Sequence, residues 1–120
     1  MAKVMVVDDA YSELKLMESI LKSAGHDVVS LIDGDALEDK LTTERPDVLL
    51  LDIVMPKRNG YEILRSLRKD ARTKSTPVVL VSSKNQESDK VWGKRQGADE
   101  YLAKPFTSDQ LLSMVKRFAR

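Results

Sequence analysis

Short runs of apolar residues recur along the chain and predict five strands. Within the runs, apolar side chains follow one another without polar alternation, which is typical of strands buried on both faces of a parallel sheet. The first and third runs, KVMVVD and DVLLLD, show this pattern most clearly. The predicted strands are Lys3–Asp8, Asp27–Leu31, Asp47–Asp52, Pro77–Ser82 and Glu100–Ala103.

Between these runs, apolar residues recur every three or four positions, which is the spacing of one face of a helix. Leu14, Met17 and Leu21 place a helix over residues 10–24, and Gly25 ends it. Further helices are predicted at Asp35–Thr42, around Ile63–Leu67, at Ser88–Gln96 before Gly97, and after the capping box Thr107-x-x-Gln110. The alternation predicts a (βα)5 chain: an α/β domain with a doubly wound, five-stranded parallel sheet and helices on both faces.

Composition narrows the possible functions of this 120-residue chain. It contains no cysteine, which excludes disulfides and thiolate chemistry, and the single His26 excludes sites built from several histidines. A net charge of +1 and 5% aromatic residues argue against nucleic-acid binding. The longest apolar stretch, Val48–Leu51, is far too short to cross a membrane, and no signal peptide is visible. We therefore expect a cytoplasmic protein without membrane insertion.

Polar side chains stand where the predicted strands end. Asp8 and Asp9 follow the first strand, Asp52 ends the third, Ser82 ends the fourth and Lys104 follows the fifth. The carboxyl ends of parallel strands meet at one edge of a sheet, where ligands bind. Three carboxylates brought together repel one another unless a cation intervenes, and an all-oxygen ligand set favours Mg²⁺ over Zn²⁺. With a lysine and a hydroxyl beside them, these groups suit an anionic phosphoryl group, and Asp52 is the expected nucleophile.

The sequence resembles the receiver domain of two-component response regulators over residues 1–120. The matching elements are Asp8-Asp9, Asp52-x-x-Met55-Pro56-x-x-x-Gly60, Ser82, Tyr101 and Lys104-Pro105. Each element alone is common, but five in this order, in or beside four of the predicted strands, are specific. The resemblance implies a flavodoxin-like strand order 2-1-3-4-5. The segment 86–98 further resembles single-domain regulators of pilus-driven twitching motility and of phototaxis.

For the site, the resemblance implies Mg²⁺-dependent phosphorylation of Asp52 by a sensor histidine kinase in a chemotaxis-like phosphorelay. Lys104 and Ser82 would contact the phosphoryl group. The implied metal ligands, for which Mn²⁺ also serves, are Asp8, Asp9, Asp52 and the backbone carbonyl of Val54. The Lys104–Pro105 bond is expected to be cis. Chemistry beyond self-catalysed phosphoryl transfer and slow autodephosphorylation is not expected, so the protein is not predicted to be an enzyme.

For output, the resemblance implies a switch. Movement of Ser82 toward the phosphoryl group would open space for Tyr101 to turn inward. That turn would reshape the surface of the fourth helix, fifth strand and fifth helix, where a downstream protein docks. No helix-turn-helix or effector enzyme is visible, so no output domain is expected. Members that dephosphorylate fast tend to carry an amide or carboxylate two residues after the phosphorylated aspartate or after the switch hydroxyl; here those residues are Val54 and Lys84.

Alternative interpretations remain open. Asp8 and Asp9 could cap the first helix, Ser82 could bond nearby backbone, and Lys104 could be a surface lysine. Trp92 is predicted to pack wholly or partly into the core, with a role as a partner anchor as the alternative. The basic residues between Lys57 and Lys74 are predicted to form a solvated face, with docking of a kinase or an acidic partner as the alternative. As a whole, the chain could instead be a phosphate sink, a docking-only receiver, an aspartate-nucleophile phosphatase or a flavin carrier. The chain lacks the Asp-x-Asp motif and the cap expected of such a phosphatase. It also lacks the glycine-rich loop expected of a flavin carrier.

Overall fold

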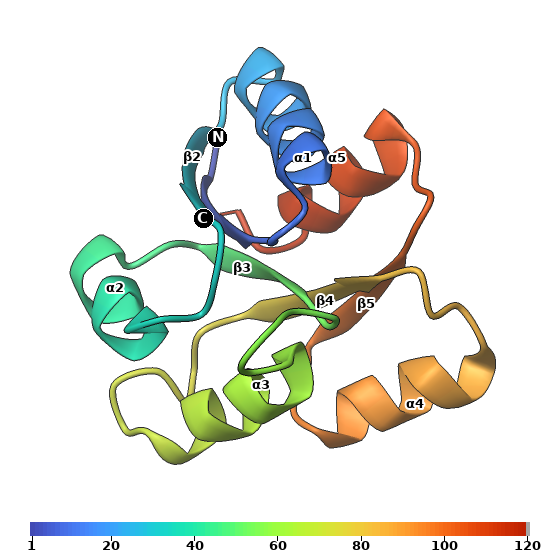
Figure 1. Cartoon of the computed structure of the whole chain (residues 1–120). Coiled ribbons are helices and arrows are strands. Elements are labelled where there is room, and N and C mark those ends of the chain that lie inside the picture. The colour runs from blue at the N-terminus through green and yellow to red at the C-terminus, as the bar shows by residue number, and fades with distance from the viewer. Residues whose placement is uncertain (120) are drawn as a thin grey trace.

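The structure is a computed structural model that describes residues 1–119. Strands and helices alternate as predicted (Figure 1), and no predicted strand boundary is wrong by more than one residue. In chain order the elements are β1 (Lys3–Val7), α1 (Tyr11–Ser23), β2 (Asp27–Leu31), α2 (Leu37–Glu44), β3 (Val48–Asp52), α3 (Gly60–Lys69), β4 (Val78–Ser82), α4 (Glu87–Arg95), β5 (Glu100–Ala103) and α5 (Ser108–Lys116).

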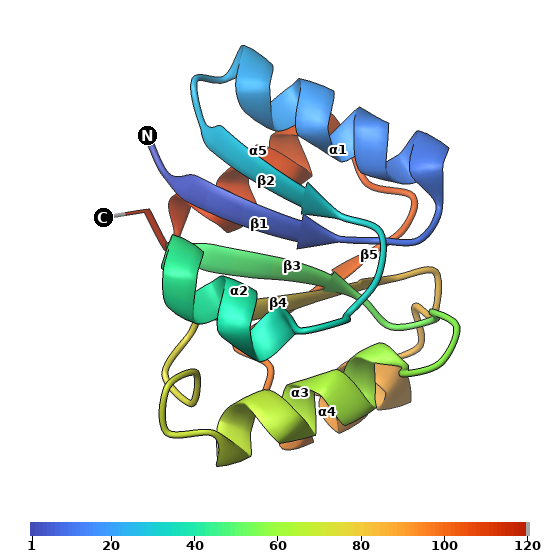
Figure 2. The ribbon, with the colours of Figure 1, turned by 60° about the vertical axis from the view of Figure 1, so that its left-hand side comes forward.

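The sheet has the order β2-β1-β3-β4-β5, and all neighbouring strands are parallel. Helices α1 and α5 cover one face, and α2, α3 and α4 cover the other (Figure 2). Successive residues of β1 face opposite sides, so Met5 and Val7 join one hydrophobic cluster while Val4 and Val6 join the other. The predicted α/β class and the flavodoxin-like order 2-1-3-4-5 are both confirmed.

Glycines and capping boxes in the sequence mark several of the helix ends. Gly25 and Gly97 lie just beyond α1 and α4 with φ of +90° and +115°, backbone that side chains with a Cβ rarely adopt. The predicted capping box at Thr107 is present at the start of α5. A second capping box, between Gln86 and Asp89, opens α4 one residue earlier than expected. Within residues 1–119, no helix combines the length and apolar content that a membrane crossing requires.

Trp92 does not pack into the core, and this expectation is wrong. The residue is 50% exposed, and Val91 beside it is 44% exposed. The residue of α4 that faces the sheet is Gly93, where an added Cβ would lie 2.9 Å from Leu80 Cδ1 and 3.1 Å from Tyr101 Cδ2. The helix approaches the sheet closely on a glycine, which turns the larger side chains of the same helical turn toward solvent.

The basic residues of α3 are not all solvated either. The Arg68 side chain is 21% exposed. Its Nε donates to the carbonyl oxygen of Gly97 at 2.9 Å, and its Nη1 donates to that of Thr76 at 2.7 Å. Its Nη2 donates to the Asp99 carboxylate at 3.0 Å. Arg68 thus joins α3 to the segments that precede β4 and β5, using the fixed fork of the guanidinium group.

Arg68→Lys is expected to lower the free energy of unfolding by about 1–2 kcal/mol, because a lysine keeps the charge but not the fork of donors. Urea denaturation measures the change. The matched control is Arg65→Lys, since Arg65 is exposed and donates to the Gln96 side chain at 3.0 Å. Equal stability of the two variants would show that the Arg68 contacts contribute nothing.

Candidate functional site

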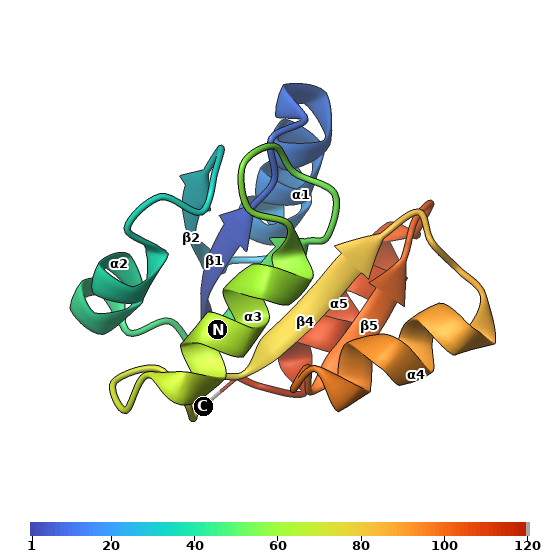
Figure 3. The same ribbon diagram turned by 60° about the horizontal axis from the view of Figure 1, so that its bottom comes forward.

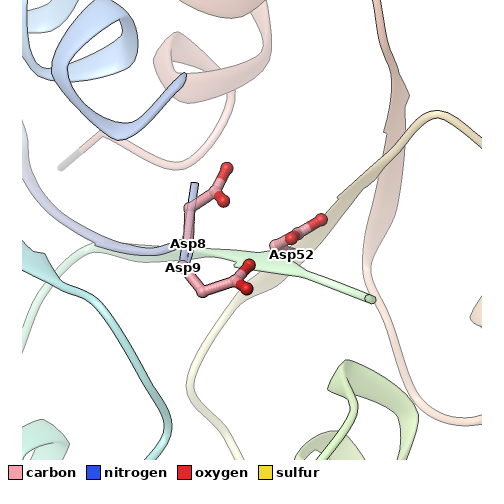
Figure 4. Close-up of side chains that lie close together, drawn as sticks. All are labelled: Asp8, Asp9 and Asp52. Carbon is pink, nitrogen blue, oxygen red and sulfur yellow. The ribbon is translucent and has the colours of Figure 1, made fainter. Parts of the chain in front are cut away.

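Three carboxylates meet at the carboxyl edge of the sheet (Figure 4). All strands point toward this edge (Figure 3). Val7 is paired with Leu51, so Asp8 and Asp9 emerge from β1 beside Asp52 at the end of β3. One carboxylate oxygen from each of Asp8, Asp9 and Asp52 lies within 4.8 Å of the others. Asp8 is fully buried and Asp52 is 7% exposed, whereas Asp9 is exposed.

This cluster fits a hard divalent cation. All its donors are carboxylate oxygens, the ligands that Mg²⁺ prefers. Mg²⁺–oxygen distances of about 2.1 Å separate neighbouring ligand oxygens by about 3 Å and opposite ones by about 4 Å, and the three oxygens here lie within 4.8 Å of one another. The acidic cluster can therefore hold a metal ion. The alternative in which Asp8 or Asp9 caps α1 is wrong, because the N-cap is Ala10, whose N–H donates to Asp8 Oδ1 at 2.9 Å.

Lys104 is the cation of the site and not a surface lysine. Its side chain is 13% exposed. Its ammonium lies 3.1 Å from Asp8 Oδ2, 3.6 Å from Asp52 Oδ1 and 2.7 Å from Glu13 Oε2. Burial opposes the charged form, but the surrounding carboxylates hold the pKa of Lys104 above its ordinary value. The Lys104–Pro105 peptide bond is cis, as expected.

Asp52 is held in an environment that disfavours its charge. Burial raises the pKa of its carboxyl to about 6; Lys104 opposes this rise, while Asp8, Asp9 and Glu13 add to it. The carboxyl opens into a cavity of about 500 Å³. Val54 lines this cavity near Asp52, and its side chain is largely exposed. Near neutral pH, Asp52 is thus a nearly buried carboxylate beside an ammonium group and an accessible cavity.

Ser82 and Tyr101 are arranged differently from the expected switch. Ser82 is buried, lines the cavity, and its hydroxyl accepts a hydrogen bond from the N–H of Lys84 at 3.1 Å. Tyr101 already faces inward, is 7% exposed, and its hydroxyl donates to the Lys84 carbonyl oxygen at 2.6 Å. Burial raises the pKa of Tyr101, and Ser82 partly offsets the rise. The inward position of Tyr101 therefore coexists with the Ser82–backbone contact. In this arrangement Tyr101 faces inward while Ser82 keeps its contact with the Lys84 N–H.

Helix α4 explains in part why the Tyr101 ring fits inward. Gly93 packs directly against the Tyr101 ring, so the absence of a Cβ leaves room for that ring between α4 and Leu80.

A second residue that the sequence did not single out is Glu13, whose contact with Lys104 crosses from α1 to the end of β5. Its only signal in the sequence is an acidic residue in the first turn of a helix that starts at the acidic cluster.

A doubly wound parallel sheet that carries an acidic cluster, a lysine and a hydroxyl at its carboxyl edge defines a receiver-type signalling domain. The chain belongs to the response regulator receiver domain family, whose sequence model matches residues 4–116.

Comparison with individual proteins agrees with this family. The chain is 44% identical over 115 residues to Protein PilH of Pseudomonas aeruginosa, covering 96% of this chain and 95% of that protein. Protein PilG of the same organism is 41% identical over 115 residues, covering 95% and 84%. The structure of the chemotaxis protein CheY4 of Vibrio cholerae superposes with a TM-score of 0.88 at 33% identity, covering 98% of both chains. The chain is therefore a receiver domain of the pilus and chemotaxis type.

Proposed function

We propose that this receiver domain accepts a phosphoryl group on Asp52 from the phosphohistidine of a sensor histidine kinase. A carboxylate oxygen of Asp52 attacks phosphorus, an O–P bond forms and the P–N bond breaks. The histidine nitrogen keeps the electron pair of that bond and takes up a proton. The observation that carries the proposal is the placement of Asp52 at the junction of the acidic cluster, the Lys104 ammonium and the cavity.

The neighbouring residues support this transfer by charge and position. Lys104 lies close enough to move onto a phosphoryl oxygen, and Ser82 offers a hydroxyl in the same cavity. Asp8, Asp9, Asp52 and the Val54 backbone carbonyl would hold Mg²⁺, or Mn²⁺ in its place. When bound, that ion would offset the negative charge of the carboxylates and of the phosphoryl oxygens.

The phosphoryl group adds about −1.5 to −2 charges and several acceptor oxygens, which is enough to bias a two-state surface. We place the docking of a downstream protein on the α4-β5-α5 face, where Tyr101 joins the site to α4. The likeness to PilH and PilG supports a role in the control of pilus-driven motility. The protein would act in the cytoplasm. A phosphate sink, which drains phosphoryl groups from the kinase without docking, is the second candidate.

The test is labelling with ³²P-acetyl phosphate. With Mg²⁺ present the protein should become labelled, with no label when the ion is chelated, because the carboxylates then repel the anionic donor. Asp52→Asn should abolish labelling, while Asp35→Asn, at an exposed aspartate, should leave it unchanged. Equal labelling of the Asp52 variant would refute the assignment. Release of phosphate from a generic ester would favour a phosphatase instead.

A further inference from the structure

Glu13 makes the shortest contact of the Lys104 ammonium. The Glu13 Oε2 atom lies 2.7 Å from Nζ, against 3.1 Å for Asp8 Oδ2 and 3.6 Å for Asp52 Oδ1. The three carboxylates of the metal cluster are Asp8, Asp9 and Asp52, so Glu13 lies outside that cluster. It reaches the lysine from the first turn of α1, with half of its own side chain exposed at 48%.

The Lys104 ammonium is held in place by two carboxylates, Asp8 and Glu13, to which it donates hydrogen bonds. Two of its three N–H donors are used in this way, while Asp52 Oδ1, at 3.6 Å, lies beyond hydrogen-bond distance. Asp8 is buried at the end of β1 and fixed by a second hydrogen bond from the Ala10 N–H. Asp52 is the group that would carry the phosphoryl oxygens. When Nζ moves toward a phosphoryl oxygen on Asp52, the contact that is free to yield is therefore the one to the half-exposed Glu13.

We propose that Glu13 is a positioning residue that holds Lys104 away from the phosphoryl group and competes with that group for the ammonium. This inference rests on the proposed phosphorylation of Asp52. A contact made in only one of two states stabilises that state, so the Glu13–Lys104 pair favours the unphosphorylated arrangement. The same carboxylate lines the cavity beside Asp52 and adds negative charge where an anionic group must enter.

Beryllofluoride, an anionic mimic of the phosphoryl group, provides the test. Its affinity is measured by calorimetry at a fixed, saturating concentration of Mg²⁺. Glu13→Gln should bind it about three- to tenfold more tightly than the parent, the range expected for loss of one competing charge-assisted hydrogen bond. The matched control is Glu62→Gln, an exposed glutamate in the first turn of α3, which should change the affinity less than about twofold.

Glu13→Asp separates contact from charge. The aspartate keeps the negative charge but is one methylene shorter, so it no longer reaches Nζ at hydrogen-bond distance. It should bind beryllofluoride more tightly than the parent, while its Mg²⁺ affinity, titrated separately, stays within about twofold of the parent value. A general loosening of the site would instead weaken both affinities. Because Glu13 is half exposed, both variants are expected to fold, and thermal unfolding checks this.

Three results would overturn the inference. The first is a Glu13→Gln affinity equal to or weaker than that of the parent. The second is a Glu13→Asp variant that binds like the parent, which would show that charge acts without the contact. The third is failure of the parent to bind beryllofluoride, or equal binding by Asp52→Asn; this result alone also refutes the proposed function, so the two failures are distinguishable.

Discussion

Asp52→Asn is expected to raise the free energy of unfolding at pH 7.5 by about 1–3 kcal/mol when no divalent ion is present. Asp52 is nearly buried, and burial raises its pKa from an ordinary value near 3.8 to about 6. An ionised carboxylate is therefore less stable in the folded chain than in the unfolded chain. Asparagine has nearly the same shape and no charge, so the variant avoids this cost.

The effect should depend on pH with a definite sign. A carboxyl whose pKa is higher in the folded state favours folding most when it is protonated, below about pH 4. That contribution is lost as the pH rises through about 6. The parent should therefore lose stability relative to Asp52→Asn between these values, and the two proteins should be equally stable at pH 4. Urea denaturation at pH 4, 5.5 and 7.5 measures the difference.

Mg²⁺ supplies an independent check on the same carboxylate. An ion that binds only the folded state stabilises it by an amount that grows with the ratio of ion concentration to Kd, so adding Mg²⁺ should stabilise the parent, the tighter binder, more than Asp52→Asn. Asp35→Asn, at an exposed aspartate, should follow the parent throughout. If the difference in free energy of unfolding between Asp52→Asn and the parent is the same at pH 4 and pH 7.5, the electrostatic explanation is contradicted. A variant less stable than the parent at pH 7.5 would contradict it as well.

The fold was predictable because each of its signals is local. Apolar runs such as Val48–Asp52 mark buried strands, and Gly25 and Thr107 mark helix ends within a few residues. The core of the site was predictable for a related reason. Parallel strands bring their carboxyl ends to one edge, so Asp8 and Asp52 had to meet once the strands were correctly placed.

The remaining features depend on side-chain reach and helix rotation, which spacing along the chain does not determine. The helical pattern of α4 did not reveal that Gly93 faces the sheet, so Trp92 was wrongly placed in the core. The contacts of Arg68 with Gly97 and Asp99 join segments about thirty residues apart. Glu13 reaches Lys104 across 91 positions of sequence. No local pattern marks such contacts.

The lifetime of the phosphorylated state is expected to be long and to shorten about tenfold or more in a double variant, Val54→Asn with Lys84→Glu. Hydrolysis of an acyl phosphate needs a water molecule aligned opposite the leaving carboxylate. Positioning of that water by a side chain that accepts its proton is worth about 10²–10⁴ in rate in favourable cases. Neither Val54, which cannot form hydrogen bonds through its side chain, nor Lys84, which only donates, can accept it.

The structure places Val54 at the cavity and Lys84 two residues after Ser82, which also lines it. Val54 lines the cavity next to Asp52 and is 61% exposed. Lys84 is exposed, and its backbone is fixed on both sides, because its N–H donates to Ser82 and its carbonyl accepts from Tyr101. Both side chains are exposed, so substitutions at these two positions are expected to leave the packed core undisturbed.

Loss of ³²P from the labelled protein after removal of acetyl phosphate measures the lifetime. The matched control is Val54→Leu with Lys84→Arg, which preserves an apolar and a cationic side chain and should decay as slowly as the parent. Decay of the Asn/Glu variant should be faster at every Mg²⁺ concentration that supports labelling, because the new amide and carboxylate act on the water and not on the ion. If the Asn/Glu variant decays no faster than the Leu/Arg control, alignment of water at these positions does not set the lifetime of this protein.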